Sequence, residues 1–146
     1  MEKDFKYKEL VKQLTSLLEG EGDEIAVMAN TAALIKEKMG FFWVGFYIVR
    51  HGELVLGPFQ GPVACMHIGY GKGVCGTAWQ RGETVVVPDV EQFPGHIACS
   101  SESRSEIVVP VFKDGAVYAV LDIDSTEPGT FDGCDARYLE EIAALI

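Results

Sequence analysis

The chain opens with two stretches in which apolar residues recur every three or four positions, which is the spacing of an amphipathic helix. The first set consists of Leu10, Val11, Leu14, Leu17 and Leu18. The second set consists of Ile25, Met28, Ala32, Ile35 and Met39. Asp23 precedes this second set as a candidate N-cap, and Gly40 follows it as a stop signal. The pattern predicts two helices, each burying one face.

Short apolar segments separated by turn residues come next and predict strands. The predicted strands cover residues 41–49, 53–57, 63–68, 84–87, 106–112 and 116–124. His51-Gly52 and Lys113-Asp114-Gly115 fall between neighbouring strands and predict hairpins. A short helix is expected over residues 74–80, a polar loop over 89–104, and a last helix from Asp132. This order predicts one α+β domain over residues 1–146, with a mostly antiparallel central sheet flanked by helices.

Two of the predicted strands have faces of very different character, because side chains alternate sides along a strand. The apolar faces carry Phe42, Val44, Phe46 and Ile48 on one strand, and Val117, Ala119, Leu121 and Ile123 on the other. The opposite faces carry Trp43, Gly45 and Tyr47, and Tyr118, Val120, Asp122 and Asp124. If the apolar faces pack on helices, aromatic rings and carboxylates gather on the other side, as in a pocket for a small cationic molecule.

A plainer interpretation of these residues stays open at this point. Asp122 and Asp124 could begin a turn and point into water, since Asp-Ser-Thr at 124–126 is good turn chemistry. Trp43 and Tyr47 could simply be core residues. The parity of the strands favours a pocket only when the acids and the aromatic residues are taken together.

The glycines of Gly71-x-Gly73-x-x-Gly76 match the dinucleotide-binding fingerprint literally, and Asp89 follows at a suitable distance. A Rossmann unit, however, needs a longer crossover helix and further parallel strands, whereas the strands here are predicted to form hairpins. The favoured interpretation is a tight turn in which glycine permits a positive φ.

Composition narrows the classes of function. Apolar residues make up 48% of the chain and charged residues 23%, which is the balance of a compact globular protein. The formal charge of −10 argues against nucleic acid, which is bound through clustered Lys and Arg. No membrane span or export signal is expected, because the longest apolar run covers only residues 41–49 and no apolar segment follows the acidic start. We expect a cytoplasmic protein.

In a reducing compartment, cysteines are more often catalytic or metal-binding than structural. The four cysteines are Cys65, Cys75, Cys99 and Cys134. None of them forms a C-x-x-C pair, so a structural zinc site is not expected. Redox chemistry or simple burial remains.

Several longer motifs resemble one family, the free methionine-(R)-sulfoxide reductases. They are Gly45-Phe46-Tyr47, Gly57-Pro58-Phe59-Gln60-Gly61, Ala64-Cys65, Gly73-Val74-Cys75-Gly76, Phe93-Pro94-Gly95-His96-Ile97-Ala98-Cys99, Ser105-Glu106-Ile107-Val108-Val109-Pro110 and Leu121-Asp122-Ile123-Asp124-Ser125. The likeness spans about residues 25–135, with three cysteines at matching separations. The resemblance implies a GAF fold.

The resemblance also implies a division of roles. By motif, Cys99 is the catalytic cysteine, Cys65 its resolving partner and Cys75 an auxiliary thiol that could exchange roles with Cys65. Glu106, Asp122 and Asp124 match the substrate-binding acids, while Trp43 and Tyr47 match the aromatic wall. Cys134 departs from this three-cysteine pattern and is interpreted as incidental. His96 and Arg104 are near Cys99 in sequence, but the sequence does not show whether either side chain reaches the Cys99 thiol.

The chemistry implied is the reduction of free L-methionine-(R)-sulfoxide by a thiolate. A crowded carboxyl with a raised pKa would supply the proton, and a second thiol would close a disulfide on the sulfenic acid. A thioredoxin-like dithiol would then restore the thiols, with no metal or organic cofactor. The resemblance is also compatible with a homodimer. Two rival classes are a non-catalytic GAF ligand-binding or regulatory module, and a structural domain without a ligand.

Overall fold

The computed structural model describes residues 2–97 and 99–146 of the chain. Its sheet consists of β1 (Trp43–Arg50), β2 (Glu53–Gln60), β3 (His67–Gly69), β4 (Val85–Val87), β5 (Ser105–Lys113) and β6 (Ala116–Ser125). The strand order is β3-β2-β1-β6-β5-β4, and each of these neighbouring pairs is antiparallel. The α+β prediction of an antiparallel sheet flanked by helices is confirmed.

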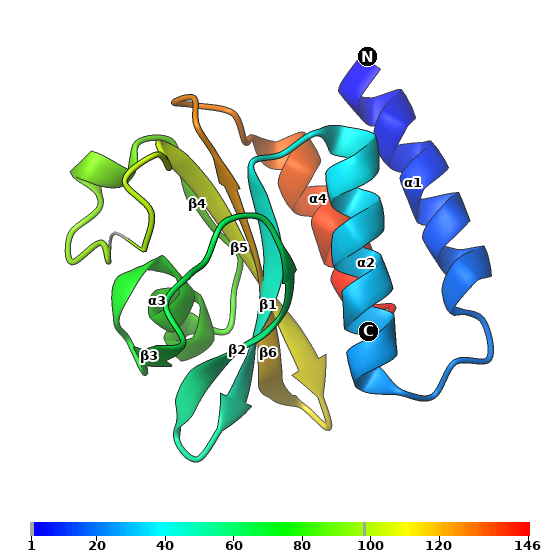
Figure 1. Ribbon diagram of the computed structural model, residues 1–146, viewed down its shortest axis with the longest axis horizontal. Helices are drawn as coiled ribbons and strands as arrows, with labels where there is room; N and C mark the ends of the chain where they lie inside the picture. The colour runs from blue at the N-terminus through cyan, green and yellow to red at the C-terminus, as the bar shows by residue number, and fades with distance from the viewer. Residues whose placement is uncertain (1, 98) are drawn as a thin grey trace.

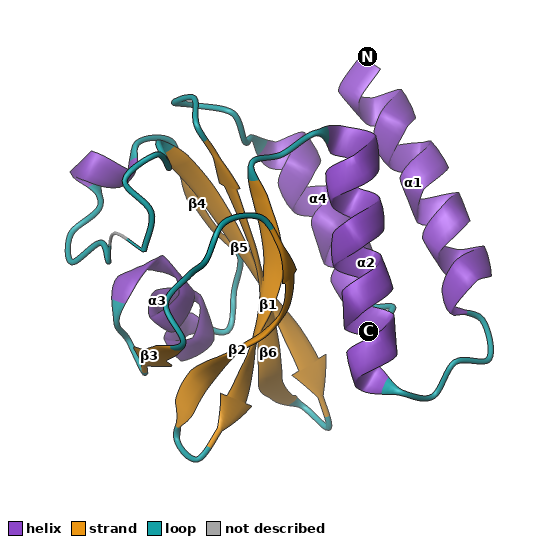
Figure 2. Ribbon diagram, viewed as in Figure 1, coloured by secondary structure: helices purple, strands orange, loops and turns teal. Residues whose placement is uncertain are grey.

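The helices lie on both faces of the sheet (Figures 1 and 2). They are α1 (Glu2–Leu18), α2 (Glu24–Met39), α3 (Gly73–Arg81) and α4 (Gly133–Ala143), with a short 3-10 helix η1 at Val90–Gln92. On one face, α2 and α4 cover the strands and α1 packs outside them; α3 lies on the other face. None of the helices in the described part of the chain has the length and apolar character needed to cross a bilayer.

The helix boundaries follow from capping chemistry. A side-chain oxygen of Asp23 accepts hydrogen bonds from the N–H groups of Ile25 and Ala26, so α2 begins where the sequence predicts. Gly40 ends α2 in the left-handed conformation. Asp132 and Asp135 form a capping box at the start of α4.

The sheet separates two apolar clusters, as its strand parity requires. Val44, Phe46 and Ile48 pack with α1, α2 and α4, whereas Trp43 and Tyr47 pack on the face that carries α3. The parity prediction is therefore confirmed along the middle of β1, and along β6 from Ala119 to Asp124.

Parity fails at the strand ends, where pairing is irregular. Phe42 precedes β1 and packs on the face that carries α3, so its predicted place on the opposite face, with Val44 and Phe46, is wrong. Val117 and Tyr118 are exchanged between the faces, because the register of β5 against β6 shifts between Val111 and Phe112.

One predicted strand is mostly wrong. The strand expected over residues 63–68 is reduced to β3 at His67–Gly69, and Val63 and Met66 are exposed in an irregular segment that precedes it. By contrast, the glycine turn is confirmed: Gly71 and Gly73 adopt positive φ, and a Cβ at Gly76 would lie 2.4 Å from the Gly69 carbonyl oxygen. These glycines serve a close backbone approach.

A polar network attaches α1 to α4. The fully buried carboxylate of Asp135 accepts hydrogen bonds from the Tyr7 hydroxyl at 2.5 Å and from Lys3 Nζ at 2.7 Å. Tyr7 is itself fully buried, so its hydroxyl has exchanged water for this single partner. The network lies on the face of the sheet covered by α2 and α4, away from the cavity described below.

We expect Tyr7→Phe to lower the free energy of unfolding by about 1–2 kcal/mol, because it leaves Asp135 with one fewer hydrogen bond inside the protein. In thermal unfolding, the Tm should fall by roughly 3–8 °C. Tyr70→Phe is the matched control, since Tyr70 is 54% exposed. Equal Tm values for the two variants would show that the buried bond adds nothing.

Candidate active site

A disulfide joins Cys65 to Cys99 across 34 residues of sequence, with the two Cα atoms 5.4 Å apart. Cys65 lies in the irregular segment between β2 and β3, and Cys99 lies in the loop between η1 and β5. Both residues are half-buried. The pairing implied by the resemblance is thus present in the structure, and it links two segments without regular pairing of their own.

The other two cysteines are free and lie on opposite faces of the sheet. Cys75 is buried in α3, on the same face as the disulfide loops. Cys134 is half-buried in α4 and packs against the helix-side cluster. The structure therefore separates Cys134 from the other three cysteines.

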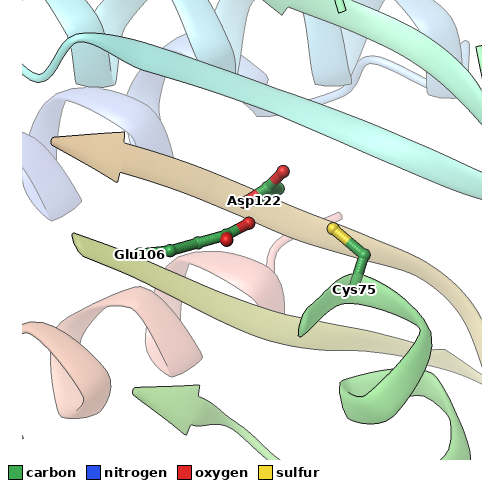
Figure 3. Close-up of side chains that lie close together, drawn as sticks. All are labelled: Cys75, Glu106 and Asp122. Carbon is green, nitrogen blue, oxygen red and sulfur yellow. The ribbon is translucent and has the colours of Figure 1, made fainter. Parts of the chain in front are cut away.

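Three carboxylates converge beneath Cys75 because of the register of β5, β6 and β1. Glu106 pairs with Asp124 across β5 and β6, and Asp122 follows two residues before Asp124 on the same face of β6. Glu106 and Asp122 are only 6% and 5% exposed. Figure 3 shows Glu106, Asp122 and Cys75 pointing toward one another from β5, β6 and α3. Residues that the sequence predicts as site residues are thus brought together.

Few positive charges balance these acids. Among the described residues, the one basic side chain within 4 Å of the three carboxylates is His96, whose Nε2 lies 3.9 Å from Glu106 Oε1. Burial lowers the pKa of His96, which favours its neutral form. Arg104, the other basic candidate, pairs instead with Glu91 at 3.6 Å. One oxygen of Asp122, Oδ1, has no hydrogen-bond partner among the described residues.

Burial and mutual repulsion raise the pKa values in this cluster. Burial, with the charges of Asp122 and Asp124, raises the pKa of Glu106 well above its usual range. Burial also raises the pKa of Asp122 and of Asp124. The pKa of Cys75 is raised well above that of a free thiol by its burial and then by Asp122. These shifts favour the protonated forms of the acids, and Cys75 stays a thiol at neutral pH.

An aromatic wall stands beside the acids. The rings of Trp43 and Tyr47 stack with centroids 6.1 Å apart, and Trp43 stacks on Phe59 at 5.3 Å. Two glycines make room for the indole: a Cβ at Gly45 would lie 2.5 Å from the ring, and one at Gly61 would lie 2.6 Å from it. Small residues at these two positions let the ring lie flat against the backbone.

These groups share one small cavity of about 40 Å³. It is lined by Trp43, Tyr47, Val63, Lys72, Cys75, His96, Ile97, Cys99, Ser103, Glu106, Asp122 and Asp124, among others. Sequence reasoning missed Val63, Lys72, Ile97 and Ser103, since they lie in irregular segments where no periodicity marks a face. In the disulfide form, the cavity holds no more than a few water molecules.

Cys75, Glu106 and Asp122 are also the donors that could hold a metal ion, since one ligand atom from each lies within 4.8 Å of the others. Thiols and carboxylic acids must lose their protons before they coordinate a metal. Because the pKa values of these groups are raised, bound protons compete with a metal for the same atoms. The cluster suits a proton and a single positive charge better than a divalent ion.

The sequence model of the GAF domain family matches residues 22–146. GAF domain-containing protein A of Dictyostelium discoideum is 54% identical, covering 99% of this chain and 92% of that protein. The free methionine-R-sulfoxide reductase of Escherichia coli K12 is 43% identical, and the match covers 96% of this chain and 86% of the Escherichia coli protein.

Solved structures give the same result. The free methionine-R-sulfoxide reductase of Neisseria meningitidis, solved in complex with its substrate, is 55% identical with a TM-score of 0.96, covering 98% of this chain and 87% of its own. The reduced form of the Staphylococcus aureus enzyme is 51% identical with a TM-score of 0.93, covering 96% of this chain and 92% of its own. By sequence and by structure, the chain belongs to the GAF-domain family of free methionine-R-sulfoxide reductases.

Proposed function

We propose that this chain reduces free L-methionine-(R)-sulfoxide to methionine, with Cys99 as the nucleophile. The observation that carries the proposal is that Cys99 lines the same cavity as three acids and is bonded to Cys65. A cysteine that both lines a cavity with acidic side chains and forms a disulfide suits an enzyme. A GAF module that only binds a ligand requires no such pair.

The cavity lining supports a free amino acid as the substrate. The ammonium group of methionine sulfoxide pairs with carboxylates of the cluster, whose Asp122 Oδ1 has no partner within the described chain. The apolar end of the substrate lies against the faces of Trp43 and Tyr47. A methionine sulfoxide within a peptide has no ammonium group to offer and is expected to be a poor substrate.

The proposed reaction has two balanced steps. The Cys99 thiolate attacks the sulfoxide sulfur, the oxygen takes up one proton and passes to Cys99 as its bond to the substrate sulfur breaks, and a sulfenic acid and methionine result. The Cys65 thiol then attacks the sulfenic sulfur, so that a disulfide forms and water leaves. A thioredoxin-like dithiol returns both cysteines to thiols by exchange. The disulfide of Cys65 and Cys99 corresponds to the state before this last exchange.

Cys75 has a different proposed part, because its environment disfavours the thiolate. Burial raises the pKa of its thiol, and the neighbouring acids raise it further. Since thiol exchange proceeds through the thiolate, Cys65 is the better resolving residue. Cys75 remains an auxiliary thiol that packs over the acids.

One turnover without reductant tests the proposal. The reduced chain, mixed with free L-methionine-(R)-sulfoxide, should yield one methionine per chain and a disulfide between Cys65 and Cys99 in peptide maps. Cys134→Ser should give the same result, since Cys134 lies on the other face of the sheet. A disulfide that involves Cys75 would require new thiol roles, and equal consumption of the (S) epimer would refute the specificity.

We expect the proton for the sulfoxide oxygen to come from Glu106, whose pKa is raised by burial and by Asp122 and Asp124. A donor is active below its pKa, so the single-turnover rate should fall as pH rises through that raised value. The single-turnover rate of Glu106→Gln should be low at every pH and should not show this fall at high pH. The exposed Glu102→Gln should still show this alkaline limb of the pH profile. The same alkaline limb in both variants would assign the proton to another acid.

A further inference from the structure

The segment that carries Cys65 is held by two aromatic side chains. Residues 61–66 lie between β2 and β3, outside the sheet. The indole Nε1 of Trp43 donates a hydrogen bond to the Pro62 carbonyl oxygen at 2.9 Å. The hydroxyl of Tyr47 donates one to the carbonyl oxygen of Cys65 itself, also at 2.9 Å. The backbone at the disulfide is therefore fastened to β1.

Both anchoring side chains are themselves firmly placed. Trp43 and Tyr47 are 4% and 1% exposed, and their rings stack on each other. They stand on β1, which is paired on both sides, with β2 and with β6. Burial raises the pKa of the Tyr47 phenol, so the hydroxyl keeps its proton and remains a donor. A rigid strand thus holds an irregular segment at the residue that forms the bridge.

We propose that Tyr47 is a positioning residue, whose hydroxyl holds the Cys65 backbone where its sulfur can close the disulfide with Cys99. The Trp43 N–H assists from three residues earlier in the segment, at Pro62. The N–H of Trp43 and the hydroxyl of Tyr47 thus position Cys65 for disulfide closure, whereas the faces of the same two rings line the cavity. The kinetic part of the inference rests on the proposed function, while its thermodynamic part does not.

Closure of the disulfide has an equilibrium that can be measured without any sulfoxide. One oxidised glutathione and the two cysteine thiols exchange to give the protein disulfide and two reduced glutathiones. The equilibrium constant reports how well the fold presents the two sulfurs to each other. Loss of one hydrogen bond that favours the closed form should weaken closure about 2- to 10-fold. This corresponds to a reduction potential about 10–30 mV less negative.

The first test compares Tyr47→Phe with the wild-type chain and with Tyr70→Phe in glutathione buffers, by alkylation and mass spectrometry of the Cys65 and Cys99 peptides. Tyr47→Phe removes only the hydroxyl, and Tyr70 is exposed and makes an edge contact with Trp79. We expect the shifted potential in Tyr47→Phe alone. An unchanged potential in Tyr47→Phe, with a native melting curve, overturns the proposal.

The second test separates the resolving step from substrate reduction. In a single turnover with free methionine-(R)-sulfoxide, Tyr47→Phe should slow disulfide closure about 2- to 10-fold more than it slows methionine formation. The Cys99 sulfenic acid should then accumulate and be trapped by dimedone. A raised KM with closure as fast as in wild type would make Tyr47 a substrate contact only. If even the wild type forms no methionine, the proposed function fails, and the glutathione equilibrium still decides the role of Tyr47.

Discussion

Cys99→Ser is expected to abolish the reduction of free methionine-(R)-sulfoxide, with kcat/KM lower by at least about 10³-fold. A serine hydroxyl is too weakly acidic to attack the sulfoxide sulfur, and no other described cysteine is equally placed. Cys75 lines the same cavity, but its raised pKa keeps it a thiol, and Cys65 does not line the cavity. Methionine formation is measured with an NADPH-coupled thioredoxin system.

The matched control is Cys134→Ser, which removes a thiol on the opposite face of the sheet and should leave kcat/KM as in wild type. Both variants should unfold at temperatures similar to that of the wild type when all three proteins are compared in reduced form, since the disulfide is then absent from all of them. Full activity in Cys99→Ser would refute the assignment of the nucleophile, whatever the cavity lining suggests.

Asp124→Asn should have the second largest effect, a fall in kcat/KM of about 10- to 100-fold, mostly through KM. The amide keeps the shape of the side chain but cannot form an ion pair with the substrate ammonium. Asp124 lies opposite both Glu106 on β5 and Trp43 on β1, so it stands between the acids and the aromatic wall. Initial rates over a range of sulfoxide concentrations give kcat and KM separately.

Asp114→Asn provides the control, because Asp114 is exposed in the β5–β6 hairpin, and an asparagine tolerates its positive φ. That variant makes the same change from carboxyl to amide outside the cavity and should match the wild type. If Asp124→Asn also retains its kcat/KM, the ammonium is held elsewhere, and the carboxyl of Asp124 has no part in binding.

The regular elements of this fold could be predicted from sequence because each carries a local signal. In helix α2 the Asp23 cap and the Gly40 stop act as expected. Met28, Ala32 and Ile35 of its predicted apolar face are buried, whereas Ile25 is 48% exposed. The opposite faces of β1 and β6 follow from alternation alone, which predicts that Trp43, Tyr47, Asp122 and Asp124 share one side of the sheet, as the structure has them. Glu106 joined them only through the family resemblance, since its own strand is buried on both faces.

The irregular segments could not be predicted in this way. Val63 and Met66 suggested a strand, yet they are 88% and 69% exposed. Carbonyl oxygens of their segment accept hydrogen bonds from the side chains of Trp43 and Tyr47 and from the backbone N–H of Leu56. Such bonds have no sequence period. The contact of Cys65 with Cys99 likewise depends on where two loops meet, 34 residues apart in sequence. The family motifs identified these two thiols, whereas hydrophobic periodicity and capping signals gave no sign of their contact.

The 40 Å³ cavity of the disulfide form has a kinetic consequence. A pocket that accepts a few waters is far below the roughly 300 Å³ at which small-molecule sites begin, so we expect the oxidised chain to bind an amino acid poorly. Under the proposed mechanism, sulfoxide and dithiol bind in turn, and we expect ping-pong kinetics. The same mechanism predicts that, when the dithiol supply runs short, the oxidised chain accumulates without sequestering methionine sulfoxide.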